Sequence, residues 1–263
     1  MKKRLIILLM LACSLNAEEW VWGRSRIVGT GYRQEEDRGN GKLLSSLYPP
    51  ALWYEFNYND STIAYDLSGN NNTGTVSGAT WVADTTGGHY SFDAAGEEIV
   101  MANNPAMTSS IPCSITAWVK RDNTTGAHFI FVRGNNGNHT RDIQISFLSG
   151  AATLQGIVFD DDPDDKIYIG RKGPCVATNW THLAMVYTGG VTTASIKLYR
   201  NGVQVDNEDI SAGSFSARQR GAVVSRIGRL DTGNELSGLI DAFVFHPYAL
   251  TSNQVLKLYQ RGQ

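Results

Sequence analysis

The sequence predicts an all-β protein, a two-sheet antiparallel sandwich of the jelly-roll type with one short C-terminal helix. Apolar and polar residues alternate in many short runs, and turns rich in Gly, Asn and Asp separate these runs. The chain has 27 glycines and only 18% charged residues, which is typical of strands and turns rather than of a helical enzyme. Uneven loops and several uninterrupted apolar strands favour a sandwich over a closed barrel.

The first residues, 1–17, have the pattern of a signal peptide. Lys2-Lys3-Arg4 gives a positive start, and the apolar run that ends at Ala12 is too short to span a bilayer. We expect cleavage after Ala17, with a lipid anchor at Cys13 as the less favoured alternative. No other stretch is apolar enough over sufficient length to cross a membrane, so a secreted, periplasmic or cell-surface protein is expected.

Two further segments follow the signal peptide. Residues 18–48 keep no regular hydrophobic period, and we expect an extended, partly disordered leader there. Pro49-Pro50 marks the entry to one β-domain over residues 49–263. The expected strands cover residues 52–56, 75–82, 90–92, 97–101, 114–120, 128–133, 142–147, 153–159, 166–169, 182–187, 195–200, 203–205, 223–228 and 237–245.

One strand, one turn and one helix have especially clear local signals. In the strand 114–120, Ile115, Ala117 and Val119 alternate with polar or amphipathic residues and should face the core. Asn201-Gly202 stands between two alternating runs, which predicts a tight hairpin because both residues tolerate a positive φ. Residues 251–260 should form the helix: Thr251 can cap it, and one face carries Val255, Leu256 and Tyr259.

Asp241 is a lone carboxylate in the apolar strand near the C-terminus. Such a group is costly to bury unless a cation or hydrogen-bond donors compensate it. The turn 66–74 is rich in oxygen-bearing side chains and could meet it. Calcium takes six to eight oxygen ligands, and the sequence therefore predicts one structural calcium ion held by Asp66, Asn70, Asn72 and Asp241. The alternative is that Asp66 caps its own turn and Asp241 pairs with an Arg or with backbone N–H groups.

Two cysteines remain after the signal peptide, Cys113 and Cys175, each near an expected strand. In an exported chain they could form one disulfide, or they could be two buried thiols. Zinc is not expected, because no His-rich cluster lies near them. The acidic run 160–165 lacks the glycine and terminal glutamate of an EF-hand loop and predicts a solvated loop tip.

Seven short sequence motifs, in order along residues 52–259, resemble those of the laminin G-like, concanavalin A-like jelly-roll family. They are Trp53-Tyr54-Glu55-Phe56 with the Asp66–Gly74 turn, Phe92-Asp93 to Val100, the Trp-bearing strand 114–120, Asn179-Trp180-Thr181-His182-Leu183-Ala184, Leu198 to Val203, Gly238 to Phe245, and Tyr248-Ala249-Leu250-Thr251. The resemblance implies a β-sandwich that binds rather than catalyses, often with one structural calcium. By position, it places Asp66 and Asp241 on that ion. Ala242 departs from the many relatives that carry an acid there.

The resemblance implies an exported binding module for a glycan or a cell-surface partner. Sugar recognition asks for aromatic faces and polar side chains in an open site. The candidate ligand-binding residues are Arg133, Asn135, His139 and Arg141, with Tyr168 or Trp180 as an aromatic platform. A net charge of −2 without a basic stretch argues against nucleic acid as a partner.

Two other functions stay open as alternatives. One is a structural protein of an envelope or particle surface without a small ligand. The other is a glycoside hydrolase on the same fold, which needs two carboxylates about 5–9 Å apart. Glu97 and Glu98 are adjacent in a strand and should face opposite ways, so they do not supply that pair.

Overall fold

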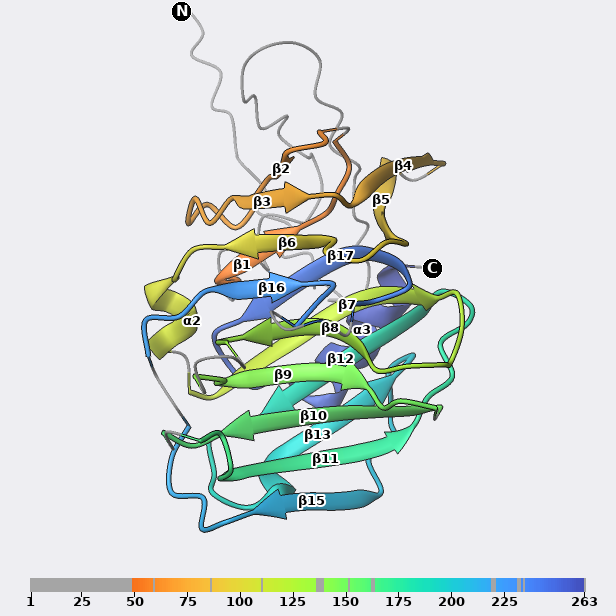
Figure 1. The fold of residues 1–263 in the computed structure, drawn as a ribbon. Helices are drawn as coiled ribbons and strands as arrows, with labels where there is room; N and C mark the ends of the chain where they lie inside the picture. The colour runs from red at the N-terminus through yellow and green to blue at the C-terminus, as the bar shows by residue number, and fades with distance from the viewer. Residues whose placement is uncertain are drawn as a thin grey trace, which may run out of the picture. The chain divides into compact units, whose positions relative to one another are not determined.

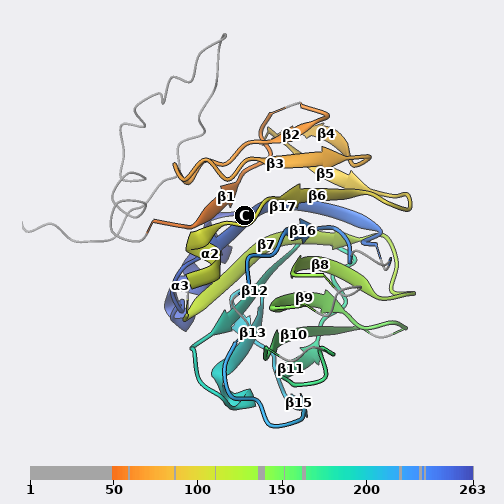
Figure 2. The ribbon, with the colours of Figure 1, turned by 60° about the vertical axis from the view of Figure 1, so that its left-hand side comes forward.

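The computed structural model describes residues 49–262, apart from 59, 86, 110, 136–139, 151, 162–163, 219–220, 231–232 and 234. The expected signal peptide and leader lie outside the described residues. Within the described part, two antiparallel sheets lie face to face, as the two views of the ribbon show (Figures 1 and 2). The expected fold class, a two-sheet antiparallel sandwich with one C-terminal helix, is confirmed.

One sheet has eight strands in the described ranges. Their order is β14 (Val203–Gln204), β13 (Ile196–Arg200), β12 (Thr181–Tyr187), β7 (Cys113–Arg121), β17 (Gly238–His246), β5 (Gly87–Phe92) and β4 (Thr80–Asp84), and β1 (Leu52–Tyr54) also pairs with β17. β7 and β17 lie at its centre. The two strands come from distant parts of the sequence, so the sheet joins the middle of the domain to its end.

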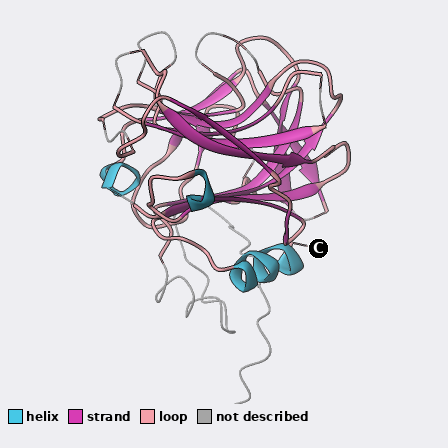
Figure 3. Cartoon of the chain, turned by 90° about the horizontal axis from the view of Figure 1, so that it is seen from below, coloured by secondary structure: helices cyan, strands magenta, loops and turns pink. Residues whose placement is uncertain are grey.

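The other sheet has nine strands in the same part of the chain. Their order is β15 (Glu208–Ala212), β11 (Tyr168–Pro174), β10 (Thr153–Phe159), β9 (Ile143–Phe147), β8 (His128–Arg133), β16 (Ser225–Ile227), β6 (Glu98–Met101), β3 (Gly74–Ser77) and β2 (Ile63–Ala64). Three short helices accompany the sheets within the described part of the chain: α2 (Pro105–Ser109), η1 (Thr193–Ser195) and α3 (Ser252–Arg261). Figure 3 shows the helices at the periphery of the two layers.

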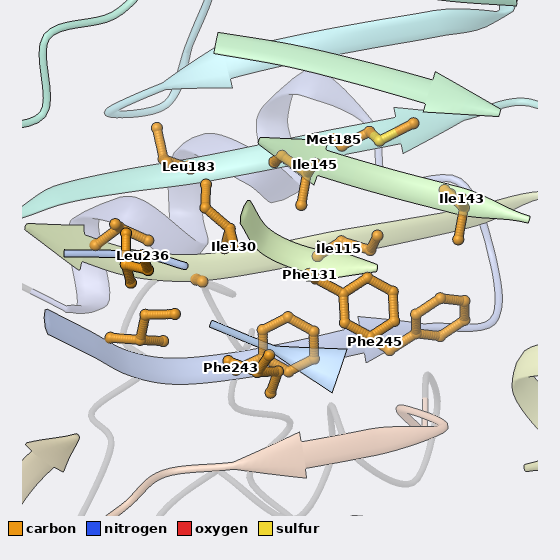
Figure 4. Packing of buried hydrophobic residues seen from close by; sticks show 14 of the residues in the cluster. Ile115, Ile130, Phe131, Ile143, Ile145, Leu183, Met185, Leu236, Phe243 and Phe245 are labelled. Carbon is orange, nitrogen blue, oxygen red and sulfur yellow. The ribbon is translucent and has the colours of Figure 1, made fainter. Parts of the chain in front are cut away.

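The hydrophobic core fills the space between the sheets. Phe131 of β8 faces Phe243 and Phe245 of β17, with ring centroids 5.1 and 6.2 Å apart, and Figure 4 shows these rings with the aliphatic side chains around them. All three are fully buried. Burying each such side chain stabilises the fold by about 1.5–3 kcal/mol.

The alternation expected in residues 114–120 is confirmed. Ile115, Ala117 and Val119 of β7 are in the core, while Trp118 and Lys120 are only partly buried on the opposite face. The strand pattern therefore separates an inner, apolar face from an outer face of the eight-stranded sheet.

The hairpin and the helix also form where the sequence predicts them. Asn201 and Gly202 join β13 to β14 with φ values of 50° and 77°, as a two-residue hairpin turn requires. Thr251 caps α3 and accepts a hydrogen bond from the Gln254 N–H. Val255 is buried against the outer face of the eight-stranded sheet, but Leu256 is 37% exposed, so the expected apolar face is narrower than predicted.

Other boundaries differ from the prediction. β15 was not expected, and residues 166–169 are only the approach to a strand that continues to Pro174. β15 is an edge strand whose side chains are mostly exposed. Its sequence therefore lacks a clear alternation of apolar and polar residues, which is the signal that predicts a strand.

A β-bulge interrupts β17 between Asp241 and Val244. Ala242 has a φ of 45° at this point. On the side away from β7, β17 pairs with β5 over Gly238–Ile240 and with β1 over Phe243–Phe245. Asp241 therefore lies at the junction where one neighbouring strand gives way to the other.

Candidate functional site

The outer face of the eight-stranded sheet carries aromatic and acidic side chains beside α3. Trp118 and Asp241 are direct cross-strand partners, and both follow core residues in their strands. They therefore point away from the core. Trp118 packs against His182 and Tyr259, with ring centroids 5.5 and 5.8 Å away, so α3 covers this end of the face.

An exposed tryptophan stands just before β12. Trp180 is 36% exposed, and its ring meets the His89 ring edge-on at a centroid distance of 5.2 Å. His89 Nδ1 lies 3.0 Å from Asp84 Oδ2. β4 and β5 carry Asp84 and His89, so a hairpin holds this contact against a loop from a distant part of the chain.

Asp241 and Glu55 form a second acidic feature near the bulge. Burial, together with the charges of Glu55 and Asp84, raises the pKa of Asp241 to about 8, against one opposing hydrogen bond from the Ala242 N–H. Burial also raises the pKa of Glu55, whose Oε1 accepts a hydrogen bond from Trp53 Nε1 at 2.5 Å. The two carboxyl groups therefore share an environment that would favour a cation.

The Asp66 turn is closed by its own hydrogen bonds. Asp66 Oδ1 accepts from the N–H groups of Trp53 (3.0 Å) and Ser68 (2.9 Å), and Oδ2 accepts from Ser68 Oγ and the Asn72 N–H, both at 2.8 Å. A carboxylate has about four acceptor sites, and four donors use them here. Asp66 thus caps its own turn and ties it to β1, as the second of the two sequence interpretations expected.

One carbonyl oxygen beside this turn has more apparent donors than it can use. Ala51 O is approached by the side-chain amides of Asn70 (3.2 Å), Asn72 (2.8 Å) and Asn104 (3.3 Å), and by Ser68 Oγ (3.4 Å). A carbonyl has two lone pairs, and amide oxygen and nitrogen exchange places on a half-turn. Rotated amides would surround the carbonyl with oxygens, which are the ligands that calcium prefers. The chemistry of this set of groups therefore fits a hard cation.

The four predicted metal ligands have three different surroundings in the structure. Asn70 and Asn72 converge on Ala51 with Asn104, which sequence reasoning did not include. Asp66 is held by protein donors, and Asp241 lies with Glu55 at the bulge. No group of three His, Cys, Asp or Glu side chains that could hold a metal occurs within the described ranges, so calcium at the turn would depend on amide and carbonyl oxygens.

Arg133 is in the interior, which corrects its expected position on a ligand-binding loop. It ends β8 and is fully buried. Its Nη1 donates to Asp142, and its Nη2 donates to Asn103 Oδ1 at 3.0 Å and to Thr108 Oγ1. Because Asp142 also binds the buried Arg218, Arg133 is part of a structural ion cluster.

The other predicted loop residues have different surroundings. Asn135 is partly buried, and His139 lies outside the described residues. Arg141 stacks on the Phe159 ring, 4.2 Å from its centroid, and its Nε donates to Asp165 Oδ2 at 3.1 Å. Its side chain keeps 20% of its surface exposed. The structure thus fixes Arg141 at the sheet rim and gives it a limited accessible surface.

Cys113 and Cys175 are both free and buried, which is the second of the two alternatives that the sequence left open. Cys113 begins the nine-residue strand β7. Cys175 adjoins Val176, whose carbonyl accepts from Arg121 at the other end of that strand. The length of β7 is roughly 26 Å, far beyond the reach of a disulfide. Burial raises the pKa of each thiol to about 11.

Glu97 and Glu98 both have structural partners. Glu97 Oε2 accepts from the N–H groups of Asp93 (2.5 Å) and Ala94 (3.0 Å) and closes their turn. Glu98 Oε2 lies 3.1 Å from Arg226 Nε. Neither arrangement resembles the acid pair of a glycoside hydrolase.

Sequence reasoning missed Asp84, His89 and Glu55 as site residues. A turn signal was present in Gly87-Gly88 between the first two, but the contact with Trp180 joins positions about ninety residues apart. The strand bulge that places Asp241 beside Glu55 has no local sequence signal that reveals its partner.

The laminin G type 3 family model, described as the concanavalin A-like lectin/glucanases superfamily, matches residues 93–256. No curated protein matches the chain. The described helices include none that is long and apolar enough to cross a membrane.

Solved structures share the fold at low sequence identity. Domain 4 of AbnA, a GH43 extracellular arabinanase from Geobacillus stearothermophilus in complex with arabinotriose, has a TM-score of 0.59 and 22% identity, covering 81% of this chain and 99% of that one. The botulinum neurotoxin serotype D binding domain has a TM-score of 0.58 and 15% identity, covering 82% and 52%.

The serotype D ligand binding domain in complex with N-acetylneuraminic acid has a TM-score of 0.55 and 15% identity, with coverage of 82% and 51%. The match thus spans about half of the botulinum domains. The family model covers more than half of this sequence, and the two-sheet architecture agrees with it. The chain belongs to the concanavalin A-like lectin/glucanase superfamily.

Proposed function

We propose that this chain is an exported, non-catalytic glycan-binding module and that Trp180 is its aromatic platform. The observation that carries the proposal is an exposed indole next to His89 and Asp84, whose side chains contact each other. Sugars present an apolar C–H face and a rim of hydroxyls. A Trp ring packs on the face, and His and carboxylate side chains bond the hydroxyls.

The structural neighbours support this function at the level of the fold. Domain 4 of the arabinanase is bound to arabinotriose, and one botulinum ligand binding domain is bound to N-acetylneuraminic acid. The arabinanase is extracellular, in line with the export that the N-terminal pattern predicts. Glu97 and Glu98 are held by turns and arginines, which favours binding over hydrolysis.

The predicted loop residues remain a second proposed contact surface. Asn135, His139 and Arg141 lie on or beside the connection between β8 and β9. Arg141 is already paired with Asp165, so it would contact a sugar only through its exposed edge. Trp180 is therefore the first residue to replace when glycan binding is tested.

A glycan array followed by calorimetry tests the proposal. The domain should bind a defined set of oligosaccharides, and Trp180→Ala should weaken that binding about tenfold, because aromatic contacts contribute up to about 1.5 kcal/mol. Asn135→Ala, tested beside it, reports on the loop surface. Full binding by Trp180→Ala would contradict the platform, and an array without any bound glycan would contradict the function.

Val191→Ala is a matched control for the loss of an exposed apolar side chain. Val191 is 53% exposed and lies in the loop before η1, away from β4 and β5. Its replacement should leave glycan affinity unchanged.

We further propose one structural calcium ion at the Asp66 turn. The carbonyl of Ala51 and the side chains of Asn70, Asn72 and Asn104 would hold it, since they already converge on one point. Bound to the folded state alone, the ion would stabilise the sandwich by mass action. It would tie the entry of the domain to the turn.

A further inference from the structure

A narrow pocket lies between the end of β1 and the β2 hairpin. Glu55 and the aromatic residues Phe56, Tyr58, Tyr65 and Tyr90 line it, with three aliphatic side chains. Its volume is about 10 Å³, which is room for one group about the size of a water molecule. None of the described lining residues is basic.

The aromatic rings stand in two edge-to-face pairs. Tyr58 and Tyr65 have centroids 5.9 Å apart with an interplanar angle of 87°, and Phe56 and Tyr90 are 5.0 Å apart at 88°. The face of each aromatic ring carries the negative part of its quadrupole. Several such rings around one space give the electrostatic environment that attracts a cation.

Hydrogen bonds to Asp60 hold two of these rings in place. Tyr65 Oη donates to Asp60 Oδ2 at 2.8 Å, and Tyr90 Oη donates to the Asp60 carbonyl at 2.5 Å. Asp60 Oδ1 in turn accepts from the N–H groups of Thr62 (2.8 Å) and Ile63 (3.0 Å). The pocket wall is therefore ordered before any ligand enters, which lowers the entropic cost of binding.

Glu55 gives the pocket its single lining carboxyl group. Its Oε1 accepts from Trp53 Nε1, and burial raises its pKa. A buried carboxylate is stabilised by a neighbouring cation. Within the pocket lining, the aromatic rings and Glu55 therefore both favour a cationic ligand.

We propose that this pocket binds an organic ammonium group and, resting on the proposed glycan-binding function, that the group belongs to an unacetylated amino sugar. The ammonium would pair with the Glu55 carboxylate and contact the Tyr58 and Tyr65 rings. N-acetylation removes the positive charge and adds bulk, so the pocket discriminates between the free amine and the amide.

The pocket and the Trp180 platform are electrostatically connected. The charges of Glu55 and Asp84 both act on Asp241, and Asp84 pairs with His89 beside Trp180. Asp241 at the bulge is thus within electrostatic reach of both.

Calorimetry with the whole domain tests the assignment directly. The probes are a glucosamine oligosaccharide and its fully N-acetylated counterpart of equal length. The unmodified domain should bind the free amine at least tenfold more tightly, and Glu55→Gln should remove that preference. Tyr58→Ala should weaken binding of the free amine, because it removes a cation–π contact.

Glu208→Gln is the matched control, because Glu208 is an exposed carboxylate on the edge strand β15. It should keep the preference for the free amine. Equal affinity for the two oligosaccharides, or an undiminished preference in Glu55→Gln, would overturn the inference. If Trp180→Ala abolishes all binding while Glu55→Gln changes nothing, the glycan function stands and the ammonium pocket fails.

A small ammonium compound tests the pocket independently of glycan binding. Methylammonium, whose –NH3+ group is about the size of a water molecule, should shift the NMR signals of the Tyr58 and Tyr65 rings in the unmodified domain and leave them unshifted in Glu55→Gln. If no glycan binds but this response occurs, the ammonium pocket is supported and the amino-sugar assignment falls. Tighter binding of a lysine-containing peptide than of the glucosamine oligosaccharide would likewise overturn the amino sugar. The absence of any methylammonium response would overturn the pocket itself.

Discussion

Arg218 binds Asp142 through two parallel hydrogen bonds in the interior of the sandwich. Nε donates to Oδ1 at 2.5 Å and Nη2 to Oδ2 at 2.7 Å, and neither side chain is exposed. Arg133 donates to the same carboxylate. One carboxylate therefore holds two guanidinium groups, from β8 and from the segment that precedes β16.

Replacing Asp142 with Asn should strongly destabilise the domain. The change leaves two buried guanidinium groups without their shared anion, and such a loss costs about 3–5 kcal/mol of the free energy of unfolding. Urea denaturation followed by fluorescence measures it. Asp164→Asn is the control, because its pair with Lys166 is exposed and should contribute less than about 1 kcal/mol. Equal effects of the two variants would contradict a structural role for the cluster.

Acidification should destabilise the fold through His182. Burial lowers the pKa of this imidazole from 6.5 to about 4, and its Nδ1 has no hydrogen-bond partner among the described residues. Below pH 6.5 the unfolded chain binds a proton that the folded chain resists, so stability falls as the pH drops toward 4. A shift of this size corresponds to about 3 kcal/mol.

Thermal melts across this pH range test the role of His182. His182→Gln removes the titrating group, so the loss of melting temperature between pH 6.5 and 4 should shrink relative to the unmodified domain. His246, whose pKa burial lowers to about 3, should keep a part of the acid sensitivity in the variant. An unchanged pH dependence in His182→Gln would contradict the prediction.

Local sequence patterns predict much of this fold. β8 and β10 have the expected boundaries, and the inward row of β7 is correct, because alternation in each strand reflects burial of one face. β15 was missed because an exposed edge strand has no such contrast. The fold class therefore follows from many repeated local signals, while single edge strands depend on their neighbours.

The site was less predictable for a related reason. Arg133 precedes a run of Gly and Asn, which indicates an exposed loop, yet its side chain turns inward to Asp142 and shares that carboxylate with Arg218. Nine residues separate the first pair and seventy-six separate the second. A local pattern shows where the chain turns, but the partner of a charged side chain is set by the packing of distant strands.

Reducing agents should leave the stability of the domain unchanged. Cys113 and Cys175 lie at opposite ends of β7, and both thiols are buried. Their raised pKa values keep the reactive thiolate form scarce. Melting curves with and without reductant should coincide, and mass spectrometry under denaturing, non-reducing conditions should find both thiols free. A bond between these two cysteines would contradict the described strand.

Removing calcium should lower the melting temperature if the Asn-rich turn binds the ion. A chelator would leave the oxygens around the Ala51 carbonyl without their cation, and added calcium should restore the melt by mass action. Asn72→Ala and Asn104→Ala should each abolish the response to chelator. Asp241→Asn distinguishes the ligands at the Ala51 carbonyl from the set that the sequence predicts, which includes Asp66 and Asp241. Loss of the response in Asp241→Asn would support the set with Asp66 and Asp241 as ligands, and a retained response would support the turn alone. A melt that chelator leaves unchanged would mean that hydrogen bonds to Asp66 hold this turn without a metal.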